Sequence, residues 1–147
     1  MNVYNLVRDR NRDNGNKYAL SITSEESTDR KITYDEMFVI VKKIAANIRN
    51  SEICSGDRVA IISENVPEWN MTFLALAKTH CTAVLLDSTL IATDLIGQMI
   101  RSDVTAVIVS PSVFAKISML VPKGIRILNL FTYGLPFEED RSRQTRV

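Results

Sequence analysis

Two carboxylates lie where α/β proteins often bind their ligands. Glu64 and Asp87 each follow a short apolar run, residues 59–62 and 83–86. If both runs are parallel strands, their carboxyl ends open at the same edge of one sheet. A pair of carboxylates there could bind Mg²⁺, as in a small phosphoryl-accepting domain. We favour a plainer interpretation, in which both carboxylates lie near helix N-termini, because the Lys and Thr/Ser that such a phosphate site needs have no clear candidates.

Other polar and aromatic side chains also have two interpretations. Asn65, Ser88 and Ser110 are expected to cap helices rather than to bind a ligand. Trp69 could stack on an adenine or line an acyl channel, but its place in a helical stripe favours the core or a subunit contact. The methionines after Met1 are interpreted as packing residues rather than as a cofactor site: Met37, Met71, Met99 and Met119.

The sequence offers little for nucleophilic or metal chemistry. Its one histidine, His80, excludes a multi-histidine metal site and a hydrolase triad with a spare base. Cys54 and Cys81 are too few for a disulfide framework or a zinc cage, and they lack Cys-x-x-Cys spacing. His80 precedes Cys81, but adjacent residues on a helix point in different directions. We therefore expect His80 at a helix terminus and no Cys–His nucleophile.

The glycines are too far apart to form a phosphate-binding loop. The closest two, Gly124 and Gly134, are ten positions apart. Such a loop needs closely spaced glycines, so that successive backbone N–H groups can point at one anion. Neither G-x-G-x-x-G nor G-x-x-x-x-G-K-[ST] occurs in the chain. We therefore predict no catalytic, cofactor-binding or metal-binding residues.

Composition narrows the class of protein. The chain has 147 residues, of which 46% are hydrophobic and 24% charged, and a formal net charge of +1. These values are typical of one globular domain, and they do not support nucleic acid or an anionic membrane as a partner. Residues 1–12 are too polar for a signal peptide, and no apolar run approaches the ~18–20 residues of a membrane span. We expect a soluble, cytoplasmic protein with reduced cysteines.

The elements that position these residues begin with a ribbon and a helix. Residues 18–23 and 31–33 are expected to be extended around a polar turn, residues 24–30. Thr33 and Glu36 have the spacing of a capping box, which predicts the start of a helix. The segment that follows has an apolar stripe at three- and four-residue spacing: Met37, Phe38, Val41, Ile44, Ala45 and Ile48.

The rest of the chain is predicted to alternate between strands and helices. Compact apolar runs favour strands covered on both faces, at residues 59–62, 83–86 and 106–109, with a weaker run at 125–130. Three helices are predicted between and after these strands. The first begins at Asn65 and has an inward stripe of Trp69, Phe73, Leu76 and Ala77, and the second covers residues 91–101 with Leu95, Ile96 and Met99 inward. The third runs from Ser110 to Pro122 with Val113, Phe114 and Ile117 inward. This predicts a three-layer α/β fold with a mostly parallel sheet of three or four strands, helices on both faces, and a short β-ribbon before it. We assign residues 1–137 to this domain and residues 138–147 to a flexible tail.

Three sequence blocks resemble the N-terminal part of the adenylate-forming superfamily, which comprises acyl-CoA synthetases, nonribosomal adenylation domains and luciferases. The blocks are ITYDEM at 32–37, SGDRVAI at 55–61, and ENVPE at 64–68 followed by FLA at 73–75 and AVLLD at 83–87. They are similar to that family's T-Y-x-E-L helix start, its G-D-R-V-A strand, and its N-x-P-E helix with the strand that follows. Their order and spacing match as well.

The resemblance implies what a complete member does. Intact members form an acyl-adenylate from ATP and a carboxylic acid with Mg²⁺, and then a thioester with coenzyme A. Their phosphate loop, adenine and ribose motifs and C-terminal lysine lie downstream of every matched block, so none has a position in this sequence. By resemblance, the chain is the N-terminal fragment of an acyl-CoA synthetase-like ligase of fatty acid metabolism. It would supply scaffold, bind no cofactor by itself and be inactive alone.

Two positions depart from the family pattern. Glu52 and His80 stand where members usually have turn glycines. Glycine is favoured where φ must be positive, because it has no Cβ to clash. Histidine is among the few other residues that visit this region. We therefore predict that His80 ends its helix in a left-handed or bridge conformation.

Two other functions stay open. One is a free-standing, non-catalytic interaction module that has kept this subdomain, and the other is a small domain that binds a nucleotide or Mg²⁺ at its strand ends. The expected partner is the remainder of a ligase chain or another copy of this chain. A subdomain cut from a larger partner exposes apolar surface, so the isolated chain is predicted to form a homo-oligomer.

Overall fold

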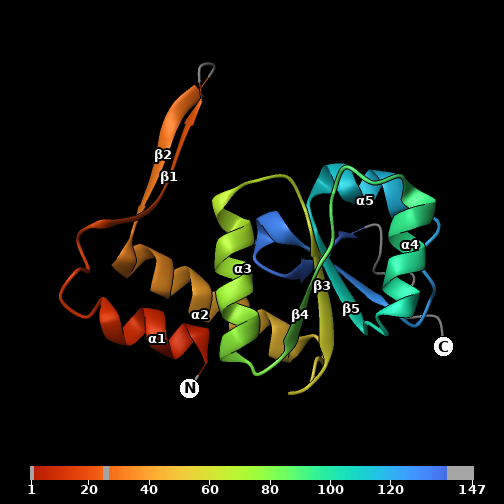
Figure 1. Cartoon of the computed structure of the whole chain (residues 1–147), viewed down its shortest axis with the longest axis horizontal. Coiled ribbons are helices and arrows are strands. Elements are labelled where there is room, and N and C mark those ends of the chain that lie inside the picture. The colour runs from red at the N-terminus through yellow and green to blue at the C-terminus, as the bar shows by residue number, and fades with distance from the viewer. Residues whose placement is uncertain (1, 25–26, 139–147) are drawn as a thin grey trace.

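The computed structural model describes residues 2–24 and 27–138 (Figure 1). Its elements are α1 (Val3–Arg10), β1 (Tyr18–Ser24), β2 (Ser27–Thr33), α2 (Tyr34–Asn50), β3 (Arg58–Ile62), α3 (Pro67–Lys78), β4 (Thr82–Leu85), α4 (Ala92–Arg101), β5 (Ala106–Val109), α5 (Pro111–Ile117), β6 (Arg126–Asn129), the 3₁₀ turn η1 (Leu130–Thr132) and β7 (Leu135–Pro136). The antiparallel ribbon β1–β2 projects from a body in which helices surround a sheet.

The main sheet has five strands within the described residues, in the order β4-β3-β5-β6-β7. Strands β4, β3, β5 and β6 run parallel to one another, and the two-residue β7 pairs antiparallel with β6. The predicted α/β class, with a mostly parallel sheet after a short ribbon, is confirmed. The sheet has five strands where three or four were expected, and the additional strand is β7, which is too short to produce an apolar run in the sequence.

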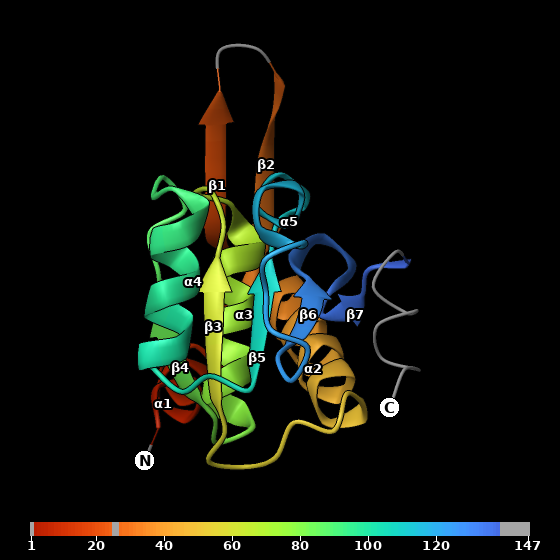
Figure 2. The ribbon, with the colours of Figure 1, turned by 90° about the vertical axis from the view of Figure 1, so that its right-hand side faces the viewer.

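Successive residues of the central strands β3 and β5 point to opposite faces of the sheet and belong to two separate hydrophobic cores. On one face, α2 and α3 pack on Val59, Ile61, Ala106 and Ile108. On the other, α4 and α5 pack on Ala60, Ile62, Val107 and Val109. Figure 2 shows α4 and α5 in front of the sheet and α2 and α3 behind it. Strands with both faces covered have no polar side, which explains the continuous apolar runs in the sequence.

Strand β4 departs from the prediction that residues 83–86 form a strand covered on both faces. It is the edge strand of the sheet, and Leu85 is 52% exposed. An apolar run indicates that a strand can be buried, but it does not say which strands flank it. The prediction of two covered faces was therefore wrong for this strand.

The predicted capping box opens α2. The Thr33 hydroxyl accepts a hydrogen bond from the Glu36 N–H at 3.2 Å, and the Glu36 carboxylate accepts one from the Thr33 N–H at 3.4 Å. The predicted stripe is buried at Met37, Val41, Ile44, Ala45 and Ile48, with Phe38 half-buried beside it. Local spacing therefore determined this helix and its inward face.

Helix α3 buries a different set of residues from the predicted stripe. Trp69, Phe73 and Ala77 are only half-buried, and of the four predicted residues Leu76 alone is fully buried. The buried set is Pro67, Glu68, Met71, Thr72, Leu74, Ala75 and Leu76. Because α3 contacts α1, α2 and the sheet together, more than one of its sides is covered. A single-stripe interpretation cannot predict such a helix.

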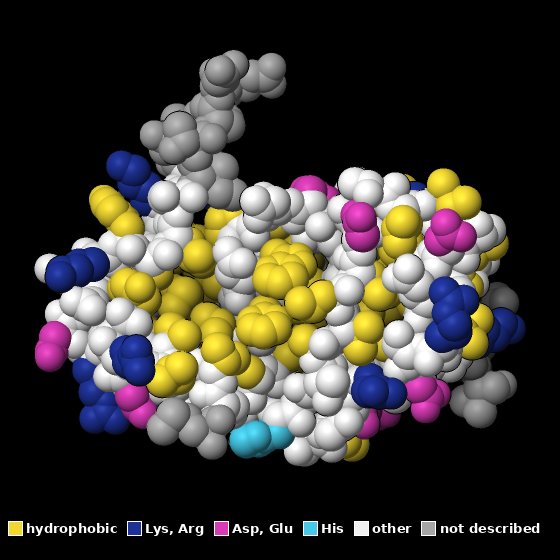
Figure 3. Space-filling view, in the orientation of Figure 1, with side chains coloured by type: hydrophobic (Ala, Val, Ile, Leu, Met, Phe, Trp, Pro, Cys, Tyr) yellow, Lys and Arg dark blue, Asp and Glu magenta, His cyan; other side chains and the backbone are white. Residues whose placement is uncertain are grey.

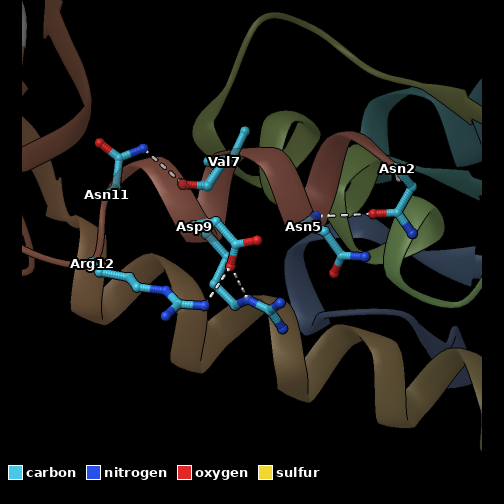
Figure 4. Close-up of polar contacts among 7 residues, drawn as sticks. Asn2, Asn5, Val7, Asp9, Asn11 and Arg12 are labelled. Carbon is cyan, nitrogen blue, oxygen red and sulfur yellow. Dashed lines mark hydrogen bonds and ion pairs between the residues drawn. The ribbon is translucent and has the colours of Figure 1, made fainter.

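Helix α1 was not predicted, because its sequence is mostly polar and only one of its residues, Tyr4, is buried. The side chain of Asn2 accepts a hydrogen bond from the Asn5 N–H at 2.9 Å, and the Asn11 side chain donates to the Val7 carbonyl at 2.8 Å (Figure 4). These bonds satisfy backbone groups at the two ends of the helix. Tyr4 is 2% exposed and anchors α1 against the core.

Smaller differences concern turns and helix ends. Met37, Met71 and Met99 are buried as predicted, but Met119 is 93% exposed because α5 ends at Ile117, well before Pro122. The expected turn at residues 24–30 is also shorter than predicted, since β2 begins at Ser27. Most of the predicted tail, residues 139–147, lies outside the described residues. None of the helices in the described part of the chain is long and apolar enough to span a bilayer.

Three α-helices among the described residues are followed by left-handed residues that are not glycine. Glu52, His80 and Asp103 follow α2, α3 and α4 with φ of 63°, 61° and 57°. After α3, the His80 N–H donates to the Ala77 carbonyl at 3.2 Å and the Cys81 N–H to the Leu76 carbonyl at 2.9 Å. These two bonds form a Schellman motif, which requires a left-handed residue at the position of His80. The prediction for His80 is confirmed.

Candidate functional site

The carboxyl ends of β3 and β5 are joined by a small hydrogen-bonded cluster. Ser110 directly follows β5 and is fully buried, and its hydroxyl donates to Glu64 Oε2 at 2.8 Å. The Ser112 hydroxyl donates to the same oxygen at 3.2 Å and lies 3.1 Å from the Ser110 hydroxyl. The cluster therefore holds the Glu64 carboxylate, which belongs to the β3–α3 loop, against the start of α5.

The environment of Glu64 favours its charged form. Partial burial raises the pKa of this carboxyl, but hydrogen bonds from its own backbone N–H and from Ser110 and Ser112 outweigh that effect. The net result is a pKa below the ordinary glutamate value. Glu64 is therefore a carboxylate at neutral pH and acts as a hydrogen-bond acceptor rather than as a general acid.

Asp87, the second candidate carboxylate, belongs to a separate hydrogen-bonded group. Its Oδ1 accepts from the Thr89 N–H at 2.9 Å and from the Thr89 hydroxyl at 2.7 Å, and these bonds lower the pKa of Asp87. Beside it, Lys116 Nζ donates to the carbonyls of Ser88 and Leu90, each at 2.7 Å. The two candidate carboxylates thus have different partners, and within the described residues no group of three or more His, Cys, Asp or Glu could hold a metal ion.

The expected helix caps are not formed by the predicted side chains. Helix α3 is capped at Val66 rather than Asn65, and α4 at Ile91 rather than near Ser88, in both cases without a side-chain bond. Ser110 does occupy the capping position of α5, but its hydroxyl bonds Glu64 instead of a backbone N–H. The hydroxyl donates to the Glu64 carboxylate in a charge-assisted hydrogen bond, and it accepts none from the N–H groups at the start of α5.

A polar hollow lies beside this cluster. It has a volume of about 260 Å³ and is lined by Ser63, Glu64, Asn65, Trp69 and Asn70. Its wall therefore offers a carboxylate, two amides, a hydroxyl and an indole. Such a set can hydrogen-bond a polar group and stack on a planar ring.

Trp69 and Asn70 line both this polar hollow and a second, apolar one. The second hollow, of about 240 Å³, is lined by Val7, Ala19, Leu20, Tyr34, Met37, Trp69, Asn70, Phe73 and Leu74. Trp69 stacks on Phe73 with ring centroids 5.8 Å apart and planes 3° from parallel. The indole is half-buried at the rim of the core, which agrees with the favoured interpretation of Trp69 as a core or contact residue.

An ion pair that the sequence did not indicate joins the β1–β2 ribbon to α3. Arg30 of β2 binds Glu68 of α3 through two bonds, Nη2–Oε1 at 2.6 Å and Nη1–Oε2 at 3.2 Å. Glu68 is 5% exposed, and its hydrogen bonds raise the pKa of Arg30. The two residues are 38 positions apart, so only the fold could reveal the pair.

His80 and Cys81 do not form a nucleophilic pair. The His80 side chain is exposed at the end of α3, whereas Cys81 Sγ contacts the Thr79 hydroxyl at 3.4 Å and the Cys54 carbonyl at 3.5 Å. Burial raises the pKa of the Cys81 thiol, which disfavours the reactive thiolate. The position of His80 at the end of α3 is the one expected from the sequence.

The fold and the sequence blocks together define the class of protein. The model of the AMP-binding enzyme family matches residues 7–143. The chain therefore belongs to the AMP-binding, adenylate-forming enzyme family, and it is homologous to the N-terminal part of these ligases. The resemblance found in the sequence is confirmed.

Comparison with individual proteins supports this assignment. Acetyl-coenzyme A synthetase of Bartonella bacilliformis is 35% identical over 77 residues, which are 52% of this chain and 12% of that protein. The N-terminal subdomain of NpsA from Klebsiella oxytoca, solved with 3-hydroxybenzoyl-AMSN, superposes with a TM-score of 0.77 at 22% identity, over 90% of this chain and 31% of that one.

A third protein has the same fold. O-succinylbenzoate coenzyme A synthetase (MenE) of Bacillus subtilis, solved with ATP and magnesium ion, gives a TM-score of 0.74 at 18% identity, over 90% of this chain and 34% of that one. The chain spans only 11% to 15% of the length of the curated relatives it matches. The activity of a whole ligase therefore does not follow from the match.

Proposed function

We propose that the chain is the N-terminal scaffold of an acyl-CoA synthetase-like, AMP-forming carboxylic acid–CoA ligase. The observation that carries the proposal is the family match over residues 7–143 in a chain without glycines spaced for a phosphate loop. Phosphoryl and adenylyl transfer depend on positioned charges around the phosphates. ATP, Mg²⁺ and coenzyme A would be bound by the remainder of a ligase, and the chain alone would be inactive. The proposal includes a cytoplasmic location and an acyl substrate from fatty acid metabolism.

The direct test of catalysis is an assay of pyrophosphate release. The isolated chain is incubated with ATP, Mg²⁺, coenzyme A and a panel of acetic, fatty and aromatic acids. We expect release no faster than in a blank without protein. Release that depends on an added acid would refute the proposed scaffold role, because the chain would then carry a complete adenylation site.

An apolar surface supports the second part of the proposal, which concerns the partner. Hydrophobic side chains gather over α3 and β4 (Figure 3), where Val66, Trp69, Phe73 and Ala83 are half-buried and Leu85 is 52% exposed. Strand β4 has neither proline nor charge, the usual features that protect a sheet edge. In a complete ligase the remainder of the chain would cover this surface. In the isolated chain a second copy would cover it.

Sedimentation of the isolated chain tests this part. We expect a dimer at tens of micromolar that dissociates on dilution, and a Leu85→Glu variant that stays monomeric. Ile100→Glu is the matched control, because Ile100 is 59% exposed but lies on α4, on the opposite side of the sheet. A monomeric wild type, or equal effects of the two variants, would contradict the proposed surface.

The alternative, a non-catalytic interaction module, is favoured by the same exposed edge. The reading frame beyond Val147 distinguishes the two functions. A transcript that continues into a Ser/Thr/Gly-rich loop supports the ligase scaffold. A stop codon directly after Val147 supports the free-standing module.

A further inference from the structure

Cys54 and Cys81 are brought together at the amino ends of β3 and β4. They are 27 positions apart in the chain, yet Cys81 Sγ lies 3.5 Å from the backbone carbonyl oxygen of Cys54. Both are free thiols; Cys54 is exposed and Cys81 is half-buried. Their sequence spacing did not suggest a relation between them, so their proximity is a property of the fold.

Backbone hydrogen bonds fix the two segments that carry these cysteines. In the loop before β3, the Cys54 carbonyl accepts from the Asp57 N–H at 3.0 Å, and the Cys54 N–H donates to Asp57 Oδ2 at 2.9 Å. Two bonds then join this loop to the turn before β4: the Gly56 N–H donates to the His80 carbonyl, and the Thr82 N–H to the Asp57 carbonyl, both at 2.8 Å. These bonds hold the backbone of the Cys54 loop beside the backbone of the turn that carries Cys81.

To form a disulfide, the Cys54 side chain would rotate towards Cys81. Cys54 Sγ lies 4.0 Å from the Glu52 carbonyl, while Cys81 Sγ already lies against the Cys54 backbone. A disulfide requires Cβ atoms about 3.5–4.5 Å apart. Because Cys54 is exposed, rotation about its Cα–Cβ bond gives up only the long contact with the Glu52 carbonyl and takes place in picoseconds to nanoseconds.

We propose that Cys54 and Cys81 form a peroxide-responsive pair that closes to an intramolecular disulfide. The Cys54 thiolate attacks hydrogen peroxide, the O–O bond breaks, and a sulfenic acid and hydroxide result. The Cys81 thiolate then attacks the Cys54 sulfur, the S–O bond breaks, and hydroxide leaves. The two thiol protons combine with the two hydroxides, so that two thiols and one peroxide give one disulfide and two waters.

The environments of the two thiols assign these roles. Burial raises the pKa of the Cys81 thiol, and Asp57 and Cys54 add to the rise, while a hydrogen bond from Thr79 and the charge of Arg49 oppose it. Cys81 is therefore the poorer nucleophile towards dissolved peroxide and acts second. The disulfide would join the loop after α2 to the end of α3. This inference does not depend on the proposed ligase function.

Peptide mapping after oxidation tests the proposal. The purified chain is treated with a small excess of hydrogen peroxide, its free thiols are blocked, and it is digested with trypsin. Cleavage after Arg49, Arg58, Lys78 and Arg101 places the two cysteines in separate peptides, residues 50–58 and 79–101. We expect a chain with no disulfide to a second chain, lighter by two hydrogen atoms, that yields these two peptides linked until a reductant is added.

The single variants Cys54→Ser and Cys81→Ser are the controls. Cys81→Ser should accumulate Cys54 sulfenic acid, detected with a dimedone probe, whereas Cys54→Ser should consume peroxide several-fold more slowly than wild type. Two free thiols after treatment, a linkage only between chains, or Cys54 oxidised to sulfinic acid while Cys81 stays free would each overturn the proposal.

Discussion

His80→Gly is expected to raise the stability of the chain or leave it unchanged. His80 has φ of 61° and an exposed side chain, so the substitution removes a Cβ from a left-handed residue and little else. The left-handed conformation costs a residue with a Cβ about 1–2 kcal/mol. Glycine adds about 0.4–1 kcal/mol of chain entropy to the unfolded state. The difference predicts a gain between zero and about 1.5 kcal/mol.

Urea unfolding followed by tryptophan fluorescence measures this change. Trp69 is the one tryptophan of the chain, and its stacking on Phe73 makes its emission sensitive to unfolding. Variants are compared at one protein concentration, because self-association would shift the midpoint. An unchanged slope of free energy against urea concentration shows that only stability has changed.

Two further glycine variants make the result interpretable. Lys42→Gly lies on the exposed side of α2 and should cost about 1 kcal/mol, the ordinary penalty of glycine in a helix. Asp103→Gly, at the left-handed residue after α4, should behave like His80→Gly. If His80→Gly loses as much stability as Lys42→Gly, the left-handed turn is absent in solution and the reasoning fails.

Three further variants test buried hydroxyl groups. Thr72 is fully buried and its hydroxyl has no hydrogen-bond partner among the described residues, so Thr72→Val should gain about 1 kcal/mol in the same urea assay. Thr79→Val, which loses hydroxyl bonds to the carbonyls of α3, should lose about 1 kcal/mol, and the reverse order would contradict this. Ser110→Ala removes a donor from Glu64, so NMR titration should show a higher pKa for Glu64; an unchanged pKa would refute that role. Because the lowered pKa of Glu64 stabilises the chain above the ordinary value of 4.5, wild type should lose stability more steeply than Ser110→Ala below that pH.

Local spacing in the sequence was enough to predict most of the elements. The capping box of Thr33 and Glu36 and the stripe after it depend on residues within one or two helical turns of each other. The run at residues 106–109 matches β5 residue for residue. The left-handed end of α3 was also predictable, because the family's turn glycine marks a backbone geometry that His80 can adopt.

The candidate site was harder to predict, because its contacts join distant parts of the chain. Glu64 could be named from its place after a strand, but its partner Ser110 is 46 positions away. The Arg30–Glu68 pair and the approach of Cys81 to Cys54 also left no pattern in the sequence. The predicted caps at Asn65 and Ser88 failed for a related reason: the helices begin one and three residues later, where the chain turns to pack on the sheet.

The sequence alone therefore determined most of the helices and strands and the inward face of α2, since these follow from periods of two to four residues, whereas α1, β7 and the buried sides of α3 did not. The tertiary structure decided the order of the strands, and with it the exposed edge at β4 and the neighbours of Glu64 and Cys81. The apolar runs of β3, β4 and β5 are alike, so any of them could occupy the edge of the sheet as far as local pattern is concerned. Which strand lies there depends on the packing of all the helices and connections at once, and this is a property of the whole chain rather than of any segment.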